Sequence, residues 1–131
     1  MASLTAEQAS TLAYYFLVYS QAIGDCRIST WHKLNAAENH SLSSLQWSIF
    51  NTSENLYALS TDLVIDEVEP APKTLGHLGD QMKQTLKVLS SVQRAVKIAT
   101  AIVTLGAAFM NKNPAGVKKA LEFALALVKI D

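Results

Sequence analysis

Charged residues are scarce in this chain of 131 residues, since only 17% are Asp, Glu, Lys or Arg against about 25% in an average protein. Half of the residues are hydrophobic, and the mean hydropathy is +0.17. This composition excludes disorder over most of the chain, because disorder requires low hydrophobicity and high net charge. Cysteine is also scarce: Cys26 alone excludes an internal disulfide and fits a reducing compartment.

Targeting and membrane-spanning segments are not recognisable either. The first ten residues, MASLTAEQAS, contain no basic region before an apolar run, so no signal peptide is predicted. No run of eighteen or more apolar residues is present, which argues against an ordinary spanning helix. These features favour a cytoplasmic protein, with membrane association left open.

Motifs of catalysis and metal binding are missing as well. The sequence has no P-loop, dinucleotide-binding glycine loop or zinc-type Cys/His spacing, and it lacks the Glu-x-x-His pairs of di-iron bundles. We interpret His32, Glu38 and His40 as polar residues of a connection rather than metal ligands. Cys26 lies near Asp25 and His32, but nothing in the sequence lowers its thiol pKa. We therefore expect no catalytic residue, no metal, no cofactor and no enzymatic activity.

Hydrophobic residues recur at helical spacing through most of the chain and predict an all-α bundle. Thr5 is a predicted N-cap, Gly24 a predicted helix end, and Pro70 and Pro72 cannot continue a helix. Pro114 occupies a favoured first helical position. The prediction is one domain over residues 1–131 with four main helices at about 5–23, 41–67, 74–110 and 114–130, and a short helix or irregular connection at 24–40.

The net charge of zero hides two halves of opposite sign. Residues 1–70 contain two basic and eight acidic residues, and residues 71–131 contain nine basic and three acidic residues, so the halves carry −6 and +6. We expect the acidic stripe of Glu54, Asp62, Asp66 and Glu69 on the second helix either to pair with Lys83 and Lys87 across a helical hairpin or to solvate that hairpin. Exposed ion pairs of this kind contribute only about 0.2–1 kcal/mol each, so they orient helices more than they stabilise them.

Arg94 and Lys97 have no acidic residue opposite them in such a hairpin. With Lys112, Lys118 and Lys119 they form a predicted basic patch, which suits an anionic partner or an anionic membrane surface. The zero net charge and the absence of a recognition motif argue against nucleic acid.

Two segments are apolar on nearly every side. Residues 12–19 are all apolar or aromatic, and residues 98–110 contain no charge. A four-helix domain encloses few positions completely. The segments are therefore central helices, or one of them is an interface with a partner or a second copy. For residues 98–110, insertion into lipid is a further alternative. The predicted interaction residues are Leu12, Tyr14, Tyr15, Phe16, Leu17, Val18, Tyr19, Ile102, Val103, Leu105, Phe109 and Met110.

Three functional hypotheses follow from these features. The first is a non-catalytic α-helical interaction module that binds another protein or assembles with itself. The second is a membrane-active or pore-forming protein of the toxin or cell-death type that inserts the hairpin of residues 98–130. The third is a carrier that holds a ligand in the interior of the bundle.

Overall fold

The computed structural model describes residues 2–3, 6–58, 64–65, 72–88, 92–111 and 114–128. Within these ranges the chain forms five α-helices, and the predicted all-α bundle is confirmed. The helices are α1 (Ala6–Ser29), α2 (Ala36–Ala58), α3 (Pro72–Val88), α4 (Val92–Met110) and α5 (Pro114–Val128). A 3-10 helix, η1 (Trp31–Lys33), follows α1, and two short strands, β1 (Ala2–Ser3) and β2 (Val64–Ile65), pair antiparallel.

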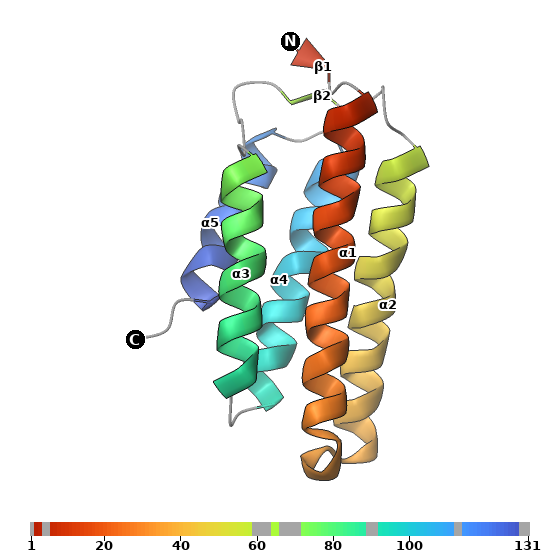
Figure 1. The fold of residues 1–131 in the computed structure, drawn as a ribbon, viewed down its shortest axis with the longest axis vertical. Helices are drawn as coiled ribbons and strands as arrows, with labels where there is room; N and C mark the ends of the chain where they lie inside the picture. Colours follow the sequence, from red (N-terminus) through yellow and green to blue (C-terminus); the bar gives the residue numbers. More distant parts are fainter. Residues whose placement is uncertain are drawn as a thin grey trace.

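The helices form two layers (Figure 1). In one layer α1 lies between α2 and α3 and packs along both of them, and α4 and α5 form the other layer. Between the layers, α2 packs on α4, α3 packs on α5, and α1 also contacts α4. The five helices therefore surround a common core, with α1 covered on three sides.

The first helix is longer than predicted because Gly24 does not end it. Gly24 is buried against α2, and a Cβ atom there would lie 2.5 Å from Nε2 of Gln46. This glycine therefore serves close packing of two helices rather than a turn. The helix ends at Ser29, after which the backbone N–H and the hydroxyl of Thr30 both donate to the carbonyl of Cys26, at 3.0 and 2.7 Å.

The second helix begins at Ala36, five residues before the predicted start, because Asn35 and Glu38 form a capping box. The backbone N–H of Glu38 donates to Oδ1 of Asn35 at 2.8 Å, and the backbone N–H of Asn35 donates to Oε1 of Glu38 at 3.0 Å. This exchange satisfies two N–H groups that a helix start leaves unpaired. The predicted end at residue 67 is also wrong, since Val64 and Ile65 belong to β2.

The helix predicted over 74–110 is two helices, α3 and α4. The prediction of one helix is wrong. Both helices bury an apolar face in the same core, so apolar residues continue at helical spacing from α3 into α4. Residues 89–91, between them, lie outside the described residues.

The expected pairing of Glu54 with Lys83 is wrong because α2 and α3 are not neighbours in the bundle. The helices α2 and α3 lie on opposite sides of α1 (Figure 1), so Glu54 does not face Lys83. The side chains of Asp62 and Lys87, which completed the expected pairing, lie outside the described part of the chain.

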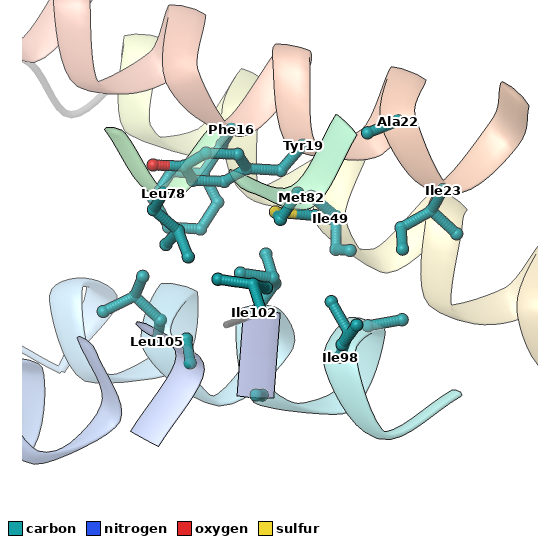
Figure 2. Packing of buried hydrophobic residues seen from close by; sticks show 14 of the residues in the cluster. Phe16, Tyr19, Ala22, Ile23, Ile49, Leu78, Met82, Ile98, Ile102 and Leu105 are labelled. Atoms are coloured by element: carbon teal, nitrogen blue, oxygen red, sulfur yellow. The ribbon is translucent and has the colours of Figure 1, made fainter. Parts of the chain in front are cut away.

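The core fills the space between the two layers (Figure 2). The ring of Phe16 meets the rings of Tyr19 and Phe109 edge-on, with centroids 5.3 and 6.1 Å apart. Gly106 of α4 permits this approach, because a Cβ atom there would lie 3.2 Å from Cε1 of Phe16 and 2.7 Å from Cγ2 of Thr52. The core residues labelled in Figure 2 come from four helices: Phe16, Tyr19, Ala22, Ile23, Ile49, Leu78, Met82, Ile98, Ile102 and Leu105.

Three buried hydrogen bonds join pairs of helices through a side-chain hydroxyl and a backbone carbonyl. Tyr19 donates to Leu75 at 2.6 Å, Ser53 donates to Ala13 at 2.7 Å, and Thr85 donates to Val128 at 2.5 Å. These bonds fix the register of α1 against α3, of α1 against α2, and of α3 against the end of α5. A buried hydroxyl without a partner would instead destabilise the fold.

The capping box predicts the effect of Asn35→Ala. We expect this variant to lower the free energy of unfolding by about 0.5–2 kcal/mol, because an N–H group at the start of α2 loses its acceptor. Asn51→Ala is the matched control, since Asn51 is exposed in the interior of the same helix. Urea denaturation followed by circular dichroism measures both variants. Equal stability of Asn35→Ala and the wild type would contradict the role of the capping box.

The buried hydroxyl of Tyr19 predicts a pH-dependent effect of Tyr19→Phe. Burial, with a smaller contribution from Tyr15, raises the pKa of Tyr19 above the value of about 10 in free tyrosine. The unfolded chain therefore releases this proton above pH 10, while the folded chain keeps it. The resulting contribution to stability is complete below pH 10 and is lost as the pH rises further.

We therefore expect Tyr19→Phe to be less stable than wild type by about 0.5–1.5 kcal/mol at neutral pH, where the lost hydrogen bond dominates. This difference should shrink by about 1.4 kcal/mol near pH 11, one unit above the pKa of the unfolded chain. Chemical denaturation at both pH values measures the change. Tyr14→Phe is the control because the Tyr14 ring is exposed. A stability difference that stays constant with pH would refute the raised pKa of the buried Tyr19 hydroxyl.

Candidate functional site

The residues predicted in segment 12–19 divide according to the three neighbours of α1. Those facing the core are fully enclosed: Leu12, Phe16 and Tyr19. Those facing the flanking helices are half-buried: Tyr15, Leu17 and Val18. Tyr14 alone among the seven points outward, and 59% of its surface is exposed. The apolar sequence of this segment is thus explained by the central place of α1, and Tyr14 is the one residue of the predicted seven that is exposed.

The residues predicted in segment 98–110 lie on α4, which packs against α2, α5 and α1. Three of them are buried, Ile102, Leu105 and Phe109, and two are half-buried, Val103 and Met110. In the described part of the chain, α4 is the one helix long and apolar enough to cross a membrane, and 44% of its most apolar window is buried within the bundle. Ile102, Leu105 and Phe109 belong to the core of the bundle, so they are not available to a partner or to lipid in this fold.

The structure reveals an exposed aromatic surface that the predicted set did not include. On α2, Trp47, Phe50, Glu54 and Tyr57 follow one another at spacings of three, four and three residues, which places them on one side of the helix. That side is turned away from the core, to which α2 contributes Leu42, Ile49 and Leu56. We call these four residues the α2 aromatic ridge.

The ridge is exposed despite its apolar character. Trp47 and Tyr57 expose 58% and 66% of their surface, Phe50 is half-buried, and Glu54 is exposed. The rings of Trp47 and Phe50 meet edge-on with centroids 5.6 Å apart. The sequence signal was available, because aromatic residues at 47, 50 and 57 lie off the stripe of Leu42, Ile49 and Leu56.

Tyr14 extends the ridge onto α1. The bond between Ser53 and Ala13 sets residue 53 level with residue 13, and the bond from Arg27 to Asn39, at 3.1 Å, shows that the two helices run antiparallel. Tyr14 is therefore level with residue 52, midway between Trp47 and Tyr57 and about 7.5 Å along the axis from each. The outer face of α1 and α2 thus exposes aromatic side chains at neighbouring levels of the two helices.

The predicted basic patch is spread over both ends of the α4–α5 pair. Arg94 donates from Nη2 to the carbonyl of Leu127 at 3.0 Å, so it caps the end of α5. Lys97 is exposed near the start of α4, and Lys118 and Lys119 are exposed near the start of α5. Eight residues separate Lys119 from Leu127, which corresponds to about 12 Å along the helix axis. Lys112 lies outside the described residues.

A surface groove lies beside Arg94. Its lining residues are Gln93, Arg94, Lys97, Ala126 and Leu127, and its volume is about 340 Å³. We call it the α4–α5 groove. It combines the apolar wall of α5 with the basic and amide groups of α4, so its chemistry suits an acidic group with an apolar neighbour.

The titratable residues considered for catalysis are not assembled into a reactive site. Cys26 is buried, and this burial raises the pKa of its thiol, an effect that the hydrogen bond with Thr30 only partly offsets. The neighbours Asp25 and His32 are exposed. Glu38 is held in the capping box. Among the residues that the structure describes, no group of three His, Cys, Asp or Glu side chains is placed to bind a metal.

The chain matches no protein-family model, no curated protein and no solved structure at a significant level of similarity.

The position of Arg94 predicts a structural role that Lys97 does not share. Arg94→Gln removes a charged donor from the carboxyl end of α5, where the helix dipole favours a cation. We expect it to lower the free energy of unfolding by about 1–2 kcal/mol. Lys97→Gln, a matched loss of charge at an exposed site, should change stability by less than about 0.5 kcal/mol. Equal effects of the two variants in urea denaturation would argue against the helix-capping bond.

Proposed function

We propose that this protein is a non-catalytic α-helical interaction module that binds a macromolecular partner through the outer face of α1 and α2. The observation that carries the proposal is the cluster of Tyr14, Trp47 and Tyr57, each more than half exposed. Tryptophan and tyrosine are enriched in the centres of protein interfaces. Covering the exposed apolar area of these side chains with a partner is favourable by about 25 cal/mol per Å².

The outer face of α1 and α2 is held rigidly by the core below it, which favours binding. The ridge stands on a helix whose opposite side is fixed in the core by Leu42, Ile49 and Leu56. The buried bond from Ser53 to Ala13 holds α2 in register with α1. Aromatic side chains on rigid helices lose little conformational entropy when a partner binds. The face is thus arranged before binding, which favours affinity.

Insertion of the 98–130 hairpin into a membrane is the second candidate, and the length and hydropathy of α4 favour it. Insertion would have to expose Ile102, Leu105 and Phe109 by opening the bundle, because these residues form part of the core. A carrier function ranks third. The α4–α5 groove lies at the surface of the bundle, where Lys97 is exposed, rather than in the interior that a carrier would use.

A photo-crosslinking amino acid at position 47 tests the proposed function. We expect it to form covalent adducts with one protein species in the cells that express the chain, and Tyr57→Ser should reduce the yield because it removes part of the same surface. A crosslinker at position 77 is the matched control, since His77 is exposed on α3.

Three results would overturn the proposal. The first is the absence of adducts from position 47. The second is the same adducts from positions 47 and 77, which indicates collision rather than binding. The third is adducts with lipid only, which together with leakage of anionic vesicles would favour the membrane-active candidate.

A further inference from the structure

Helices on opposite sides of the bundle carry opposite charges. Within the described residues, α2 contains Glu38 and Glu54 and no Lys or Arg. The described parts of α4 and α5 together contain four basic residues, Arg94, Lys97, Lys118 and Lys119, and one acidic residue, Glu122. In the fold α2 and α5 lie on opposite sides of the bundle (Figure 1). Among these residues, α2 therefore forms an acidic side and the α4–α5 pair forms a basic side.

The α2 aromatic ridge on one side and the α4–α5 groove on the other are complementary in their chemistry. On the acidic side, Glu54 is exposed and lies between Phe50 and Tyr57 along the α2 aromatic ridge. On the basic side, the α4–α5 groove offers the exposed ammonium of Lys97 and the apolar wall of Leu127. A carboxylate and a neighbouring aromatic ring are the two groups that attract such a cation.

An exposed aromatic residue extends the apolar wall of the groove. Phe123 exposes 60% of its surface and precedes Leu127 by four residues, so both lie on the same side of α5. The groove is thus bordered by an apolar side chain that a partner's aromatic ring can contact. Arg94 keeps its bond to the Leu127 carbonyl and holds the wall in place.

We propose that the α2 aromatic ridge of one copy docks into the α4–α5 groove of a second copy of the same chain. This inference rests on the proposed function and names the partner. The ridge and the groove occupy different sides of the molecule, so one copy cannot satisfy both of its own surfaces. The contact is heterologous, and repeated contacts of this kind give rings or open chains of copies.

The size of the ridge sets the expected strength of the association. Aromatic side chains contribute about 150–250 Å² each when buried, and those of Trp47 and Tyr57 are already partly covered. A stable interface buries about 800 Å² per partner, which the ridge alone does not supply. The association is therefore weak and depends on charge, so it should strengthen at low ionic strength and high protein concentration.

Charge reversal on the two surfaces tests the proposal with sedimentation velocity and light scattering of the full chain. Glu54→Lys and Lys97→Glu each place like charges across the contact, so each should weaken self-association about tenfold at low salt. The matched controls are Asp80→Lys and Lys83→Glu, which make the same charge changes at exposed positions on α3. These controls should associate as the wild type does.

Restoration of binding distinguishes this contact from other modes of association. An equimolar mixture of Glu54→Lys and Lys97→Glu chains should associate as the wild type does, because each ridge then finds a groove of opposite charge. The double variant should associate with itself for the same reason. Circular dichroism confirms that each variant is folded, as expected for substitutions at exposed sites, and Trp47→Ser provides an uncharged test of the ridge.

Several outcomes would overturn the inference. One is a chain that stays monomeric at every concentration and ionic strength. If position 47 then still forms adducts with another protein, the proposed function stands and only the second copy is excluded. Stronger association of Glu54→Lys would indicate a symmetric ridge-to-ridge contact instead. Binding of a monomeric chain to phosphatidylserine vesicles that Lys97→Glu abolishes would assign the groove to a membrane surface.

Discussion

The constraint on which this structure depends is the enclosure of α1 by three other helices. Residues 12–19 carry no polar side that could face water, so α2, α3 and α4 must cover them. Close contact is possible because small residues stand at these crossings: Gly24 against α2, Gly79 of α3 against the Tyr19 ring, and Gly106 of α4 against the Phe16 ring. The two-layer arrangement, with α1 between its neighbours, satisfies this requirement.

This enclosure also explains which surfaces remain for function. Once α1 occupies the centre, most apolar residues of the predicted interaction set are part of the core or are half-buried under flanking helices. The aromatic residues of α2 receive no such cover, because Leu42, Ile49 and Leu56 already fill the inward side of that helix. The same arrangement separates α2, which carries Glu54, from α5, which carries Lys118 and Lys119.

The errors in the predicted helix boundaries have specific causes. Gly24 was interpreted as a helix end because glycine favours such positions, but its missing side chain makes room for Gln46. The second helix was predicted to begin at about residue 41, whereas the capping box of Asn35 and Glu38 starts it at Ala36. The break between α3 and α4 has no hydrophobic signature, since both helices face the same core. By contrast, Pro114 begins α5 as predicted, because its fixed backbone angle acts locally.

Local spacing and composition were enough to predict the helical class, the absence of an internal disulfide, the start of α5 and the opposite charges of the two halves. They did not reveal which apolar residues are enclosed, because apolar residues recur at the same helical spacing on a side covered by one neighbour and on a side covered by three. The tertiary structure decided this, and it also decided that Arg94 caps a helix while Lys97 borders a groove. Those two roles depend on which helix lies beside α4, and residues far apart in the chain set that neighbour.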